Sequence, residues 1–177
     1  MTTKDTVSAA AIPNLEAMAQ ELARCTFTDF DRAKQLLAEL GEQLAPQSPF
    51  DARLTYRRCA TFLENQWQHY DKALEHATRV VAILESLADA HGLAETWADI
   101  SGIYQNMLNW SQAQESIDRA RRYLNETASP RLRAQVDCRE GFLLLHLGNT
   151  AAALDSFLKA EDGLMGIGPE AALKEHY

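Results

Sequence analysis

A stripe of five positions recurs four times along this chain, and each copy begins at the fortieth position after the start of the one before. The third copy consists of Trp110, Ala113, Ile117, Ala120 and Leu124, and successive residues in it are three, four, three and four positions apart. This is the spacing of one face of an α-helix. The other copies are Phe30, Ala33, Leu37, Leu40 and Leu44; Tyr70, Ala73, Ala77, Val80 and Leu84; and Thr150, Ala153, Phe157, Ala160 and Leu164. A repeat of this length predicts stacked helical units.

The sequence before each stripe predicts a partner helix, so that each unit is an antiparallel pair. One such helix carries Trp97, Ile100, Tyr104 and Met107 at one-face spacing. We therefore expect an all-α fold of four helix pairs, at about 14–46, 48–91, 93–126 and 129–166. Residues 1–13 are expected to form a mobile leader, and 169–177 either begin a fifth repeat or form a capping helix. Outside the helical stripes, no alternation of apolar and polar residues is long enough to predict a strand.

Local signals set the expected helix ends. Asn14 is placed as the cap of the first helix, and Ser48 and Ser129 are placed as caps before Pro49 and Pro130, because proline is favoured at the first helical position. Gly92 is expected to end the helix that starts near Tyr70, at about His91. A small residue recurs beside each turn, where the two helices of a pair approach most closely; these residues are Ala33, Ala73, Ala113 and Ala153.

Composition limits the partners and the cell compartment. The chain has 177 residues, of which 46% are hydrophobic, and this is enough to build one continuous core. A net charge of −8 with no local basic cluster argues against nucleic acid and against anionic membranes. No apolar run approaches the roughly 18 residues that span a bilayer. Three unpaired cysteines, Cys25, Cys59 and Cys138, fit a reducing cytoplasm.

The sequence offers no pattern typical of a catalytic or metal site. No two of its five histidines stand four residues apart on one predicted helix, and no paired-cysteine motif exists. Gly163, Gly166 and Gly168 are neither preceded by a strand nor followed by Lys-Ser/Thr, so a helix stop explains them better than a phosphate loop. We expect a protein that is not an enzyme and that has no metal ion or cofactor.

The third and fourth units carry the motif residues of a known family. The third has Trp97, Ile100, Tyr104 and the stripe from Trp110, and the fourth has Gly141, Gly148 and the stripe through Phe157. In this respect the chain resembles the tetratricopeptide repeat (TPR) proteins, over about residues 14–164. The resemblance implies an α-solenoid that winds as a right-handed superhelix. The unit here is longer than the family's usual length of about 34, and it is similar to the long repeats found in regulatory regions of bacterial signalling proteins.

The family correspondence also implies a binding surface, because the first helix of each TPR pair lines a concave groove. The residues that it assigns to this groove are Arg58, Phe62, Asn65, Gln66, Gln105, Asn106, Arg139, Phe142, Leu145 and His146. Their amides, arginines and phenylalanines suit a peptide. Phe62 and Gly102 stand where the family's clamp for a C-terminal carboxylate uses asparagine, so that particular ligand is not predicted.

Two functions remain open from the sequence. In the first, the chain is a protein-binding or regulatory module that captures a peptide or partner protein in its groove. It would then form the N-terminal part of a larger signalling protein with a diguanylate cyclase (GGDEF) or histidine kinase output domain. In the second, it is a structural or oligomerisation scaffold, such as a homodimer, or a free-standing adaptor without such a domain.

Overall fold

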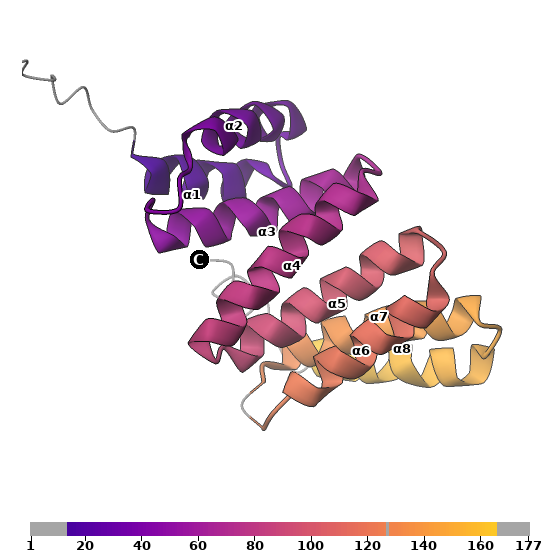
Figure 1. Ribbon diagram of the computed structural model, residues 1–177. Coiled ribbons are helices and arrows are strands. Elements are labelled where there is room, and N and C mark those ends of the chain that lie inside the picture. Colours follow the sequence, from indigo (N-terminus) through magenta and orange to yellow (C-terminus); the bar gives the residue numbers. More distant parts are fainter. Residues whose placement is uncertain (1–13, 127, 166–177) are drawn as a thin grey trace, which may run out of the picture.

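The computed structural model describes residues 14–126 and 128–165, which form eight α-helices and no strand (Figure 1). The expected all-helical fold is therefore confirmed for this part of the chain. The bounds of the helices are α1 Leu15–Cys25, α2 Phe30–Gln43, α3 Phe50–Gln66, α4 Tyr70–Leu87, α5 Ala90–Asn106, α6 Trp110–Tyr123, α7 Pro130–His146 and α8 Thr150–Met165. The expected leader at 1–13 and the segment 169–177 lie outside the described residues.

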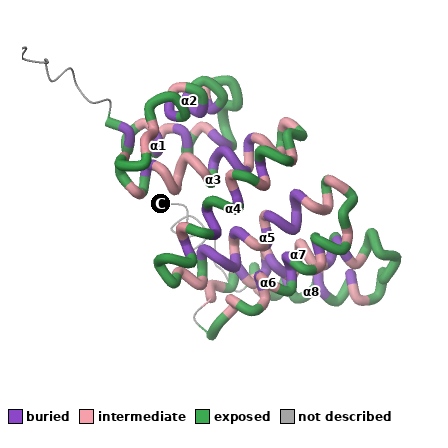
Figure 2. Tube along the Cα trace, in the orientation of Figure 1, coloured by how far each residue is buried: buried purple, intermediate pink, exposed green. Residues whose placement is uncertain are grey.

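The helices pack as consecutive pairs, α1 with α2, α3 with α4, α5 with α6 and α7 with α8. The second helices begin at Phe30, Tyr70, Trp110 and Thr150, so the period of the sequence is also the period of the structure. The small residues predicted at the helix crossings are all buried, with Ala33, Ala73 and Ala113 at 0% exposure and Ala153 at 1%. In Figure 2 the buried positions lie along the helix faces that meet one another, as expected for amphipathic helices.

The predicted end of the helix that starts at Tyr70 is wrong. Helix α4 ends at Leu87 instead of His91, and Ala88 closes it in the left-handed conformation at φ 54°. Asp89 then caps α5 by accepting a hydrogen bond from the Gly92 N–H at 2.9 Å, so Gly92 lies in the first turn of a helix and does not break one. The reason for glycine here is space, because a Cβ would lie 2.6 Å from the Asp89 carboxylate and 3.0 Å from the Arg58 guanidinium.

Ser48 does not cap α3 as expected. Its hydroxyl accepts a hydrogen bond from the Ala45 N–H at 2.9 Å and so closes the loop before the helix, while Pro49 occupies the cap position. The other two predicted caps are confirmed. Asn14 accepts from the Ala17 N–H, and Ser129 accepts from the Leu132 N–H with Pro130 at the first helical position.

The contacts between successive pairs are uneven. Helix α1 packs on α3, α5 packs on α7, and α4 packs on α5. Among the described residues, α3 and α5 have no comparable contact. We call the α5–α7 contact the closed junction and the space between α3 and α5 the open junction. None of the described helices is long and apolar enough to cross a membrane.

Candidate binding cleft

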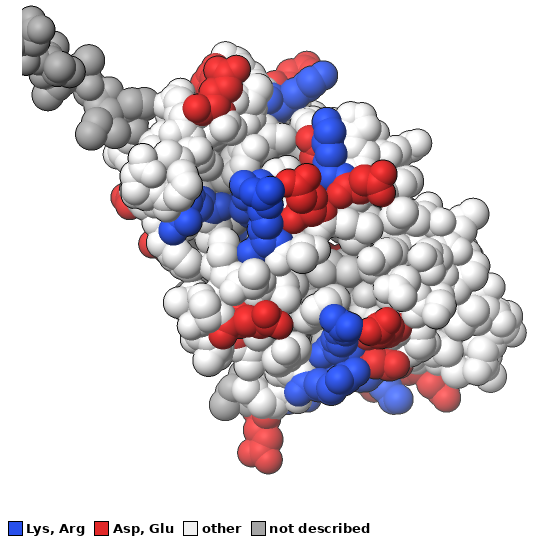
Figure 3. Space-filling model, in the orientation of Figure 1, with Lys and Arg blue, Asp and Glu red and all other residues white. Residues whose placement is uncertain are grey.

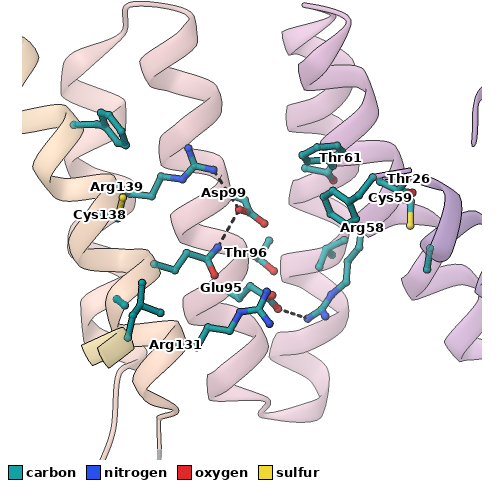
Figure 4. Close-up of a pocket in the computed structure, with 18 residues that line it drawn as sticks. Thr26, Arg58, Cys59, Thr61, Glu95, Thr96, Asp99, Arg131, Cys138 and Arg139 are labelled. Atoms are coloured by element: carbon teal, nitrogen blue, oxygen red, sulfur yellow. Dashed lines mark hydrogen bonds and ion pairs between the residues drawn. The ribbon is translucent and has the colours of Figure 1, made fainter. Parts of the chain in front are cut away.

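The open junction contains a cleft of about 610 Å³. Helices α3, α5 and α7 contribute most of its lining, and Phe27 joins them from the turn after α1. Figure 4 shows side chains of α3 and α7 reaching toward α5 from opposite sides of this space. A cleft of this size is large enough to hold a ligand or a short stretch of chain, because binding sites in proteins are typically hundreds of cubic ångströms in volume.

One part of the cleft is aromatic. Phe27 and Phe62 form a tilted pair with ring centroids 4.7 Å apart, and Phe142 packs edge-on against Phe157 at 5.2 Å. Phe27 is 69% exposed and Phe142 is 45% exposed, although both are large apolar side chains. Phe62, Gly102 and Phe142 occupy the same position of the repeat. Glycine in the central copy leaves room there for the Arg139 guanidinium, because a Cβ would lie 2.9 Å from its central carbon.

The other part of the cleft is charged. The Arg58 guanidinium lies 3.3 Å from the Glu95 carboxylate, and the Arg139 guanidinium lies 3.9 Å from Asp99 (Figure 4). The Gln135 amide donates a hydrogen bond to Asp99 at 3.3 Å. Among the described residues, Arg131 lines the cleft without an ion pair or hydrogen bond. Three arginines thus share the cleft with two carboxylates.

Glycine positions Arg139. A Cβ on Gly102 would lie 2.9 Å from the central carbon of the Arg139 guanidinium, so this group rests directly on the backbone of α5. The Gln105 amide also donates to the Arg139 carbonyl oxygen at 3.1 Å, which ties this turn of α7 to α5. The guanidinium therefore stays at the side of the cleft, close to Asp99.

Asp99 has an unusual electrostatic environment. Loss of solvation among the surrounding helices raises the pKa of its carboxyl group to about 6, although Arg139 and Arg58 act to lower it. Its side chain is still 45% exposed, because it faces the cleft and not the packed core. This carboxyl group therefore changes its charge at a higher pH than an ordinary aspartate does.

The structure brings some of the predicted site residues together and leaves others apart. Arg58, Phe62, Arg139 and Phe142 all line the cleft. Asn65 and Asn106 do not; they hydrogen-bond to each other at 3.0 Å. Four more predicted residues lie outside the cleft lining, namely Gln66, Gln105, Leu145 and His146. The His146 ring stacks on Trp110, with centroids 4.8 Å apart.

Sequence reasoning missed the residues one or two turns nearer the start of each lining helix. These are chiefly Glu95, Asp99, Arg131 and Gln135. The repeat itself carries a signal for Asp99, because it occupies the same repeat position as Cys59 and Arg139, which also line the cleft. A carboxylate and a guanidinium at matching positions of adjacent units predict an ion pair between the units.

On the face drawn in Figure 3, acidic and basic groups lie together in mixed clusters. Within 14–126 and 128–165, no group of three or more His, Cys, Asp or Glu side chains could hold a metal ion.

When the sequence is compared with known proteins, neither a family model nor a curated protein matches it.

Proposed function

We propose that this protein is a TPR-like α-solenoid that binds a segment of a partner protein in the cleft of the open junction. The observation that carries the proposal is the pair Phe62 and Phe142, which line one cleft from two different helices, with Phe142 left 45% exposed. Aromatic side chains in a concave site with arginines beside them are typical of the residues that dominate protein–protein binding energy.

The long repeat supports a regulatory role for this binding. Its similarity to the repeats of bacterial signalling proteins suggests a cytoplasmic module that controls an attached output domain, such as a diguanylate cyclase or histidine kinase. Capture of a partner segment that touches both α3 and α7 would hold these two helices in one relative position. A ligand that favours one arrangement of the helices in this way can pass a signal along the stack.

A displayed library of random peptides tests the binding function. We expect selection on the wild-type protein to yield peptides that bind the double variant Phe62→Ala/Phe142→Ala at least about tenfold more weakly. The matched control is Leu87→Ala/Leu147→Ala, which removes two leucines exposed by 53% and 51% outside the cleft. Circular dichroism should show the same helicity in all three proteins. If no peptide is enriched, or if the peptides bind the phenylalanine variant equally well, the proposal is wrong.

One observation favours a second function, that of an oligomerisation scaffold. Helix α8 exposes Leu154 by 57% and Leu158 by 48%, whereas the corresponding positions of α6 are Gln114 and Asp118. An apolar face at the end of a helical stack suits a further unit or a second copy of the chain. Sedimentation of the wild type and of Leu158→Lys distinguishes the two functions, because a scaffold would dissociate in the variant and a cleft-dependent binder would retain its peptides.

A further inference from the structure

The cleft is locally basic in an acidic protein. The chain carries a net charge of −8, yet among the described residues Arg58, Arg131 and Arg139 line the cleft together with two carboxylates, those of Glu95 and Asp99. Arginine in a partly desolvated site binds carboxylates with paired, charge-assisted hydrogen bonds. This excess of guanidinium groups is therefore complementary to an acidic group on the molecule that enters.

The three arginines are engaged to different degrees. Arg131 has no ion-pair partner among the described residues, and Arg58 is paired with Glu95 at 3.3 Å. The Arg139–Asp99 distance of 3.9 Å is too long for a direct hydrogen bond between the charged groups. An incoming carboxylate can therefore replace Asp99 beside Arg139 without breaking a strong contact.

We propose that the cleft binds an acidic side chain of the partner segment, which replaces Asp99 as the counter-ion of Arg139 and so couples binding to the uptake of one proton by Asp99. This inference rests on the proposed function, and it specifies the chemistry of the same site. The proton comes from solvent and forms an O–H bond on the Asp99 carboxylate, which becomes the neutral acid, and no other bond of the protein is made or broken.

The spacing of the arginines favours a side chain of a continuous segment. Arg131 and Arg139 are eight residues apart on α7, a distance of roughly 12 Å along a helix that rises about 1.5 Å per residue. A segment extended by about 3.3 Å per residue can span this length, and it can place an acidic side chain beside Arg139 and an apolar side chain against Phe62 or Phe142.

The groups that face Asp99 decide the sign of the pH dependence. Arg58 faces it from α3, Glu95 lies one turn before it on α5, and Gln135 and Arg139 approach from α7. A further carboxylate in this cluster repels the Asp99 anion and favours its neutral form. Because the Asp99 pKa is about 6 before binding, a proton is taken up at neutral pH, and binding strengthens as the pH falls. The thiol of Cys59 stays neutral here, because burial raises its pKa.

A pair of capped tetrapeptides tests the inference, acetyl-Phe-Ala-Ala-Glu-amide and its Gln counterpart. Titrations of the ¹⁵N-labelled protein, followed by NMR at about pH 5.5 and about pH 7.5, give the affinities; the peptide carboxylate is ionised at both values. We expect the Glu peptide to bind about tenfold more tightly than the Gln peptide. We also expect the affinity of the Glu peptide to rise about tenfold between the higher and the lower pH.

Variants separate Asp99 from general charge effects. In Asp99→Asn the Glu peptide should bind more tightly at about pH 7.5, and the pH dependence should fall below about twofold. Asp155→Asn removes an exposed carboxylate of α8 that does not line the cleft, and it should retain the full pH dependence. Arg139→Gln should lose most of the preference for Glu over Gln, while Arg122→Gln, an exposed position on α6, should keep it.

Four results would overturn the inference, and the last of them comes from the peptide library. The first is equal binding of the Glu and Gln peptides, and the second is an unchanged pH dependence in Asp99→Asn. The third is a requirement for a free C-terminal carboxylate, shown by tighter binding of acetyl-Phe-Ala-Ala-Gln with a free carboxyl end than of the Glu amide. If library peptides without acidic residues bind in a manner that depends on Phe62 and Phe142, the inference is wrong and the proposed binding function stands.

Discussion

The closed junction between α5 and α7 and the open junction between α3 and α5 join equivalent helices of the same repeat, yet only one of them is packed. At one repeat position the residues are Arg58, Ala98 and Cys138. Ala98 is fully buried in a cluster with Leu132 and Val136 of α7, whereas Arg58 is exposed and faces the cleft. A small residue lets two helices approach, and a long charged one faces solvent. Single positions in a repeat therefore decide where a binding site forms.

Polar contacts follow the same division. Across the closed junction the Gln105 amide donates to the Arg139 backbone, and Gln135 donates to Asp99. Across the open junction, Arg58 and Glu95 form an ion pair with side chains 41% and 39% exposed, and Asn106 meets Asn65 near the helix ends. Exposed ion pairs contribute little to stability. The contacts across the open junction are thus weak enough for a partner to displace them.

The largest expected effect comes from adding bulk to the closed junction. Ala98→Leu should lower the free energy of unfolding by about 1–3 kcal/mol, because the surrounding residues of α6 and α7 leave no space for three more carbons. The matched substitution at the same repeat position of the open junction is Arg58→Leu, which should change it by less than about 0.5 kcal/mol. Urea unfolding measures both. Equal losses would mean that the two junctions are packed alike.

A second test uses neighbouring residues of α5 that reach in opposite directions. Gln105→Ala removes a partly buried hydrogen bond to α7 and should cost about 1 kcal/mol. Asn106→Ala removes an exposed hydrogen bond to α3 and should cost no more than about 0.5 kcal/mol. Thermal unfolding of both variants gives the comparison. The reverse order would show that the open junction is the stronger of the two.

The contrast between the junctions also explains which features could be predicted from the sequence. The constant period of the five-position stripe predicted the helix pairs, because burial of a helix stripe depends on spacing along the chain alone. Gly92 was misassigned because Asp89 caps α5 and leaves no room for a Cβ there, so this glycine lies in the first turn of a helix and does not end one. Glu95 and Asp99 were missed because acidic residues in a chain of net charge −8 look like ordinary solvated surface. Only the arrangement of three helices shows that these carboxylates share a cleft.

The smallest expected effect concerns the charge of Asp99 at the edge between the two junctions. Its pKa is about 6 in the folded protein against an ordinary 3.8, so the folded state binds the proton more tightly than the unfolded state does. This group therefore lowers stability as the pH rises from about 4 to about 6, and its full cost is present at pH 7 and above. Asp99→Asn should raise the free energy of unfolding at about pH 7.5 by up to about 1 kcal/mol, since solvent screens a side chain that is 45% exposed.

The difference between Asp99→Asn and the wild type should shrink as the pH falls toward the ordinary pKa of 3.8, and it should vanish about one pH unit below that value, where the wild-type carboxyl group is neutral in both states. Asp155→Asn supplies the control, because its exposed carboxylate on α8 does not line the cleft, and it should change the free energy of unfolding by less than about 0.5 kcal/mol. Unfolding curves at several pH values measure both differences. A destabilised Asp99→Asn at about pH 7.5 would mean that the ion pair with Arg139 outweighs the loss of solvation. The closed junction would then depend on that pair, and Asp99 would not be free to release Arg139 to an incoming carboxylate.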